Sequence, residues 1–436
     1  MIPWLAPLAG AVATLVWVRW AFHAPHRVVM SVIGVICVLP AAAFPSMKGL
    51  PQPTLLDVGL AVATASWVWK ALRGRARWNQ NPEGVAVLVF LGVLLVAFVQ
   101  GIGATVPEQR LAFCRLVLSV LFFFSVTHGL QTRRQLQEAV VMAVAGSWLA
   151  ACIAIVFYLL PPEATHGFLG GLGWAGYPVG DSVVRFVAGT DIRRATGTAV
   201  DPNLLGGLLA LSLPLALSQG LGVRPALPRT LFLISAGTIA IALMLTFSRA
   251  AWIGALVATI VLGLVGYRRV WWGIPVAAAA AVIGPWREKL WQRLQSGVLW
   301  SDRSSLMRLD EYRDAITRVA QNPALGIGFG TPPGLDPVLR VSSTYLLIAE
   351  QSGLLGLLTF LAVPALILRR SAQGSRSGLP KDTAAIQAGA VAALCGALAI
   401  GLFDHYFFNY GFPQTIALFW LAAGLAAWPL RIRPDG

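Results

Sequence analysis

The sequence predicts an all-α, polytopic integral membrane protein. Of its 436 residues, 57% are hydrophobic and 12% are charged, whereas a soluble globular protein is typically about one quarter charged. Apolar stretches long enough to cross about 30 Å of hydrocarbon recur along most of the chain. The alternating ten-residue pattern of a membrane barrel is not seen. No compositional break divides the sequence, so residues 1–436 are expected to form a single transmembrane domain.

We expect thirteen transmembrane helices, or twelve if one of the early apolar stretches is re-entrant. The four cysteines all fall in apolar segments, a pattern typical of buried thiols rather than of disulfides or a metal site. The expected spans are 2–20, 28–46, 53–71, 84–102, 111–129, 139–160, 202–220, 229–247, 250–267, 270–286, 343–368, 383–403 and 412–430.

The short connections between these spans predict the orientation of the chain. One set is basic and includes "KALRGRARW", "QTRRQ" and the tail "RIRPDG", whereas the alternate set, such as "GIGATVPEQ", is nearly free of Lys and Arg. Short cytoplasmic loops carry the positive charge. The C-terminus is therefore expected in the cytoplasm and, with an odd number of spans, the N-terminus outside.

Two long loops, 161–201 and 287–342, are expected on the outer face. The second contains "SSLMRLDEYRDAITRVAQNP", in which Leu306, Leu309, Ile316 and Val319 recur at roughly helical spacing. This spacing predicts an amphipathic helix that begins at Ser304 or Ser305 and stops at Asn322-Pro323. The "GIGFGTPPG" stretch that follows is expected to be a turn region.

Unusual polar residues gather at the outer ends of the predicted spans. They lie in "RRATGTAVDPN", in the "TFSRAAW" corner between two spans, in a Ser-Ser-Thr-Tyr cluster and in "FDHYFFNYG". Arginine near the hydrocarbon is costly unless it is paired or faces water, and its planar fork of donors suits phosphate oxygens. These arginines indicate an anionic ligand such as a diphosphate. The alternative interpretation is that they anchor to lipid headgroups.

Four of these motifs, in order, make residues 190–360 resemble the O-antigen ligase/polymerase family. They are "RATGTAVDPNLLGGLLALSLPLAL", "LTFSRAAWIGAL", "RLDEYRDAITRVAQNPALGIGFG" and "STYLLIAEQSGLLGLL". The resemblance implies a GT-C-type glycosyltransferase on the outer (periplasmic) face of the bacterial inner membrane. It also implies an undecaprenyl-diphosphate-linked glycan donor, a lipid-linked glycan or lipid A-core acceptor, membrane lipids and a chain-length regulator protein as partners, and no nucleic acid.

Carried onto this sequence, the resemblance assigns a diphosphate-binding role to Arg194 and Arg249, with Arg193 and Arg308 as further candidates. The Asp201-Pro202-Asn203 motif is expected to start a helix. The acceptor pocket is expected to contain Ser342, Ser343, Tyr345 and Arg340.

Ser342 stands where the family's ligases have a histidine that activates the acceptor hydroxyl, and Ser343 replaces their asparagine. A serine cannot act alone as a base near neutral pH. The difference favours a repeat-unit polymerase over a ligase, with an inactive variant as a further interpretation.

The sequence leaves the catalytic base open among four candidates, which are Glu350, His405, Asp404 and Glu311. Each also has a structural interpretation: Glu350, expected to face the bundle interior, could bond a neighbouring helix, and His405 could anchor at the interface. No acidic pair suited to Mg²⁺ is seen, so no metal or other cofactor is expected. A lipid-linked glycan transporter is a more distant alternative, because no repeated halves are visible. A membrane scaffold would leave the arginines unexplained.

Overall fold

The computed structural model describes most of the chain as α-helix. Eight of the helices among the described residues are long and apolar enough to cross a membrane, and three shorter apolar helices accompany them. The prediction of an all-α polytopic membrane protein is therefore confirmed. The described residues are 23–43, 52–73, 81–177, 184–187, 190–223, 225–275, 279, 283, 287–298, 303–330, 341–374 and 379–431.

Eleven of the thirteen expected spans correspond to helices. The expected span 2–20 lies outside the described residues, and so does most of 270–286. The 3-10 helix η5 (Arg268–Trp272) overlaps the start of the second span. The eleven helices are α2 (Pro25–Val38), α3 (Leu55–Leu72), α4 (Pro82–Gly101), α5 (Pro107–Gly129), α6 (Arg133–Leu159), α8 (Pro202–Leu221), α9 (Arg229–Leu245), α10 (Arg249–Leu264), α14 (Thr344–Gly374), α15 (Lys381–Gly401) and α16 (Pro413–Ala427).

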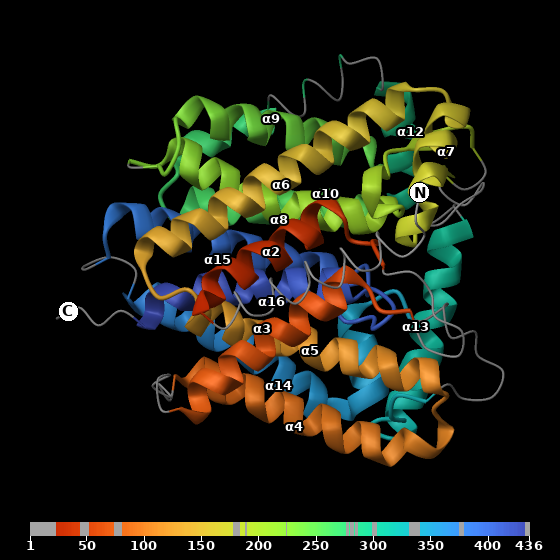
Figure 1. Cartoon of the computed structure of the whole chain (residues 1–436). Helices are drawn as coiled ribbons and strands as arrows, with labels where there is room; N and C mark the ends of the chain where they lie inside the picture. Colours follow the sequence, from red (N-terminus) through yellow and green to blue (C-terminus); the bar gives the residue numbers. More distant parts are fainter. Residues whose placement is uncertain are drawn as a thin grey trace, which may run out of the picture.

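These helices run side by side across the view of Figure 1, and α8 and α16 are the most deeply buried. In each of these two helices 89% of the apolar window is buried, against 33% in α3 and in α4. Helices α8 and α16 therefore form the centre of the bundle, and α3 and α4 lie at its periphery.

The long loops contribute the remaining elements, which gather at one end of the bundle (Figure 1, right). The loop 161–201 contains helix α7 (Pro162–Gly171) and an antiparallel pair of two-residue strands, β1 (Arg185–Phe186) and β2 (Arg193–Arg194). The loop 287–342 contains α12 (Arg287–Val298) and α13 (Arg303–Gln321). Short 3-10 segments are η1 (Ile102–Ala104), η2 (Gly173–Ala175), η4 (Gly197–Ala199) and η6 (Trp428–Arg431).

Helix α13 ends before Asn322-Pro323, as predicted, and begins at Arg303, just before the predicted Ser304 or Ser305. It is turned differently from what its apolar spacing suggests. Leu306 and Ile316 are 54% and 57% exposed, whereas Ala315 is fully buried. The face toward the bundle also carries half-buried Arg308 and Tyr312. Their polar contacts with other segments, described below, decide the rotation of the helix.

Helix α14 is broken at Gly353, which has φ 68° and ψ −174°. The segment 323–328 fills the break: the N–H groups of Ile327 and Gly328 donate to the carbonyls of Glu350 and Gln351 at 2.8 and 3.1 Å. In return, the Leu354 N–H donates to the Pro323 carbonyl at 2.8 Å. Irregular backbone at membrane depth is tolerated where protein satisfies its polar groups. The Gly-rich segment therefore serves as a specific partner of α14.

We expect Gly353→Ala to lower stability by on the order of 2–5 kcal/mol, because positive φ and overpacking each carry a cost. A Cβ at this position would lie 2.1 Å from the Ala324 carbonyl oxygen. The check is the Tm of the purified protein in detergent. Gly237→Ala in α9 is the matched control, since nothing lies within 4 Å of its Cβ position. Equal Tm values for the two variants would contradict the interpretation.

Candidate active site

The start of α8 holds Arg194 in place. Asp201 caps the helix, its Oδ1 accepting from the N–H groups of Asn203 and Leu204 at 2.7 and 3.2 Å, and Pro202 occupies the first turn, as predicted. Arg194 donates from Nε to the Thr246 carbonyl and from Nη2 to Oδ1 of Asn203, both at 2.7 Å. One guanidinium therefore joins strand β2 to the start of α8 and the end of α9.

Two glycines on α8 allow other segments to approach the same place. A Cβ on Gly207 would lie 2.6 Å from the ring of Tyr406, and one on Gly206 would lie 3.2 Å from Cβ of Ser248. Ser248 is the residue before α10, whose first residue is Arg249. The sequence Leu-Leu-Gly-Gly after the helix start thus brings the α9–α10 corner and the 404–406 segment against α8.

Three arginines from separate segments come together here, and we call Arg194, Arg249 and Arg308 the guanidinium cluster. Burial lowers the pKa of Arg194 to about 10, and the charges of Arg249 and Arg308 act in the same direction. Asp201 and Asp404 oppose this shift. These three arginines lie on β2, α10 and α13, and the fold brings Arg249 and Arg308 within electrostatic range of Arg194.

Asp404 is the buried carboxylate of this cluster. It follows the end of α15 and is 7% exposed. Burial raises its pKa to about 6, although the charges of Arg308 and Arg194 and a hydrogen bond from the His405 N–H lower it. A carboxylate that changes charge near neutral pH suits general base catalysis. Of the four base candidates, Asp404 has the charge environment best matched to that role.

Helix α13 fixes the backbone of Ser342 beside the cluster. Glu311 Oε2 accepts from the Ser342 N–H at 2.9 Å, and the Tyr312 hydroxyl donates to the Ser342 carbonyl at 2.9 Å. The same hydroxyl lies 3.2 Å from the Leu402 carbonyl. Burial raises the pKa of Tyr312, so its hydroxyl remains a donor at neutral pH. Glu311 is therefore used in a backbone contact and is less available as a base.

The other predicted acceptor-pocket residues mostly join α14 to α15. The Ser343 hydroxyl donates to the Gly401 carbonyl at 3.3 Å, and the Tyr345 hydroxyl donates to the Leu398 carbonyl at 2.6 Å. Thr344 donates from its N–H and its hydroxyl to the Asp404 carbonyl, at 3.0 and 2.9 Å. These contacts position Asp404. Arg340 lies outside the described residues.

Glu350 faces the bundle interior, as expected, and is 6% exposed. Its Oε1 lies 2.9 Å from Nη1 of Arg318 on α13. A carboxylate held in such a pair serves to hold α13 on α14. The structure therefore gives Glu350 a partner that the sequence did not indicate, 32 residues away.

We expect Arg318→Met to lower stability by about 3–5 kcal/mol, because it leaves the Glu350 carboxylate buried and unpaired. The double variant Arg318→Met/Glu350→Gln should recover part of the loss, and denaturation of the purified protein measures both. Arg313→Met is the control, since the Arg313–Asp310 pair is exposed and 3.5 Å long, and such pairs contribute about 1 kcal/mol or less. A double variant as unstable as the sum of its single changes would contradict the pairing.

Arg193 and His405 lie beside the cluster rather than in it. Arg193 donates to the Leu160 carbonyl and, at 2.9 Å, to the Thr165 hydroxyl, so its guanidinium holds α7. Successive side chains of a strand point to opposite faces, which is why Arg193 and Arg194 separate. The His405 ring stacks on Phe412, and its Nδ1 lies 3.9 Å from Asp404 Oδ1.

Comparison with known proteins gives one family match. The model of a family described as "O-Antigen ligase" matches residues 234–361. The match covers 128 of the 436 residues, and it makes this part of the chain similar to the O-antigen ligase family. The long apolar helices of the described residues support a multi-pass membrane location.

No curated protein matches this chain in sequence. Among solved structures, a similar chain comes from work titled "Structural coordination of polymerization and crosslinking by a peptidoglycan synthase complex". It is 17% identical over 79% of this chain and 96% of that chain, with a TM-score of 0.46.

The O-antigen ligase match includes Arg249, Arg308, Glu311 and Glu350 but stops before Asp404. Sequence reasoning about the family missed Tyr312 and Arg318, although a signal was present. Arg308, Tyr312 and Ala315 are spaced three to four residues apart and share a helix face. Because Tyr312 shares a face of α13 with the candidate Arg308, the sequence could have indicated that Tyr312 belongs to the site.

Proposed function

We propose that the protein is a glycosyltransferase that transfers a glycan from undecaprenyl diphosphate to an acceptor on the outer face of the membrane, as a repeat-unit polymerase. The observation that carries this proposal is the buried Asp404 carboxylate within electrostatic range of Arg308 and Arg194, with the charge of Arg249 acting on Arg194. Several cations within range of one another suit a diphosphate leaving group, whose developing charge they stabilise in the transition state.

In this mechanism Arg194 and Arg249 bind the diphosphate, and Arg308 contributes further positive charge. Asp404 accepts the proton of the acceptor hydroxyl as the new glycosidic bond forms and the lipid diphosphate leaves. Holding two membrane-tethered substrates in one orientation supplies part of the rate enhancement. Ser342, whose backbone Glu311 and Tyr312 fix, is assigned to the acceptor pocket in this proposal.

The acceptor separates a polymerase from a ligase. Serine in place of the family's histidine at 342 favours the polymerase, whereas the description of the matched family favours the ligase. Purified protein given only lipid-linked repeat units should produce a ladder of longer chains. Product that forms only after lipid A-core is added would establish the ligase instead.

The proposed orientation can be tested without substrate. A variant lacking the four native cysteines would carry a single new cysteine, either Leu402→Cys or Arg268→Cys. Leu402 is 53% exposed and lies near Asp404 in the chain, whereas Arg268 is exposed and follows the end of α10 that is opposite Arg249. A membrane-impermeant maleimide added to intact cells with a permeable outer membrane should label the first and spare the second. The reverse pattern would place the cluster in the cytoplasm and end the proposal.

A further inference from the structure

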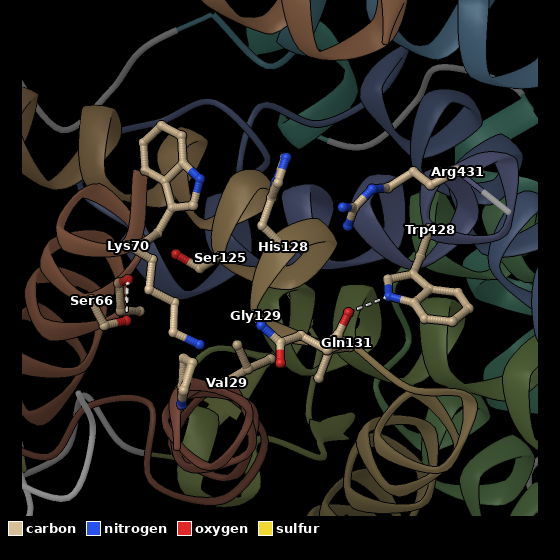
Figure 2. A pocket seen from close by; sticks show the side chains of 13 residues that line it. Val29, Ser66, Lys70, Ser125, His128, Gly129, Gln131, Trp428 and Arg431 are labelled. Carbon is tan, nitrogen blue, oxygen red and sulfur yellow. Dashed lines mark hydrogen bonds between the residues drawn. The ribbon is translucent and has the colours of Figure 1, made fainter. Parts of the chain in front are cut away.

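A polar cavity lies at the other end of the bundle from Asp404. Helix α16 begins at Pro413, shortly after Asp404, and ends at η6, so its 15 residues separate the two sites by about 22 Å. The cavity has a volume of about 270 Å³ and lies among the ends of α2, α3, α5 and η6 (Figure 2). At roughly 30 Å³ for each water, this space equals about nine water molecules.

The cavity presents hydrogen-bond donors and positive charge. Figure 2 shows the Lys70 ammonium and the Arg431 guanidinium reaching into it from opposite sides. Among the described residues that line it, none is acidic. The Ser125 hydroxyl and Nε of Arg431 are buried and have no hydrogen-bond partner among the described residues. Buried donors left unbonded are costly, so this lining is matched to an acceptor-rich anion.

The local charge balance also favours an anion. Glu83 is the carboxylate whose charge acts on Arg431. It is 1% exposed and already paired with Nη1 of Arg370, 2.6 Å from its Oε1. Arg370 in addition donates from Nη2 to the Leu430 carbonyl at 3.2 Å. Glu83 therefore acts on two guanidinium groups, those of Arg370 and Arg431, and Lys70 adds a further positive charge to the lining of the cavity.

The cavity lies at the depth of lipid headgroups. Trp69 and Leu72, which flank Lys70 at the end of α3, are 45% and 80% exposed. The Arg73 guanidinium lies 4.0 Å from the centre of the Trp69 ring. Exposed tryptophan beside cationic side chains is typical of the membrane–water interface. The wall of the cavity is itself tied together there, since Nε1 of Trp428 donates to the Leu130 carbonyl at 2.6 Å.

We propose that this cavity is a phosphate-binding site for the headgroup of an anionic phospholipid. Lys70 and Arg431 neutralise the phosphate from two sides, and the Ser125 hydroxyl donates to one of its oxygens. Basic pockets between transmembrane helices bind acidic lipid headgroups through this chemistry. The same donors could bind soluble phosphate, so the experiment must separate the two sources.

The test compares wild type with the double variant Lys70→Gln/Arg431→Gln by native mass spectrometry and by Tm. The probes are phosphatidylglycerol, phosphatidylcholine and inorganic phosphate, each added to delipidated protein. We expect phosphatidylglycerol to be retained and to raise the Tm of wild type, and its affinity for the double variant to fall at least about tenfold. Arg268→Gln is the control, because Arg268 is exposed and does not line the cavity.

Each outcome decides. Binding of inorganic phosphate that competes with phosphatidylglycerol keeps the phosphate site and assigns it to a soluble ligand. Equal retention of phosphatidylglycerol by wild type and the double variant would overturn the proposal. A rise in the Tm of wild type as large with phosphatidylcholine as with phosphatidylglycerol would also overturn it. If the double variant does not fold, Ser125→Val leaves both cations in place and removes one donor. Unchanged affinity in that variant would equally overturn the proposal.

Discussion

Replacing Arg194 by Gln is expected to reduce glycan transfer by about 10²–10³-fold, the loss typical for removal of one preorganised group that stabilises transition-state charge. Arg194 is half-buried, and its guanidinium lies within electrostatic range of Arg249 and Arg308. Gln keeps an amide that can donate to the Thr246 carbonyl, so the fold around β2 should persist. The measurement is the initial rate of product formation with lipid-linked donor, alongside the Tm.

Arg193→Gln is the matched control for this prediction. It removes the same charge one residue earlier, from a side chain that bonds to the Leu160 carbonyl and Thr165. We expect less than about a tenfold loss, through the packing of α7. Similar losses of transfer rate in the two variants would show that the rate depends on the total charge of the loop. The position of Arg194 in the cluster would then have no specific effect on the rate.

The helices and the start of α8 could be predicted because their causes are local. Apolar runs of about twenty residues mark the spans, and Asp201 followed by Pro202 marks a helix start whose capping bonds are made within three residues. The ends of α13 are similarly local, at Arg303 and before Asn322-Pro323. Features of this kind depend only on residues that are close in sequence, so they can be predicted without the tertiary contacts.

The break in α14 could not be predicted, because its cause is distant. Gly353 and Gly356 are both glycines in an apolar run, yet only Gly353 has positive φ. What distinguishes them is the segment 323–328, whose backbone bonds to the residues on both sides of Gly353. Nothing within α14 itself specifies which glycine opens.

The same reasoning applies to the candidate site. The sequence identified Arg194, Arg249 and Arg308 as residues that are costly near lipid, but it left four carboxylate and histidine candidates equal. Their contacts separate them, since Glu350 pairs with Arg318 and Glu311 bonds to the Ser342 backbone. Asp404 stands apart because its carboxylate is buried within range of two arginines.

Asp404→Asn is expected to reduce glycan transfer by about 10²–10⁴-fold, the range typical of a lost general base. With a pKa of about 6, the carboxylate is mostly ionised at pH 7. The wild-type rate should therefore fall about tenfold for each unit of pH below 6, and this dependence should disappear in the variant. Glu350→Gln and His405→Ala should both keep it. An unchanged acid limb in Asp404→Asn would assign the base elsewhere.

The stability of the protein should change with pH in the opposite direction. The pKa of Asp404 rises from 3.8 to about 6 on folding, so between these values the folded chain binds more protons than the unfolded chain. Its contribution to stability is fully present below pH 4 and is lost, by about 3 kcal/mol, as pH rises through 6. Asp404→Asn removes the buried charge and should raise the Tm at pH 7 while it lowers activity by the factor given above. If Asp404 served only to stabilise the fold, the same substitution would lower the Tm. A higher Tm together with lower activity therefore distinguishes a catalytic base that destabilises the fold from a structural residue.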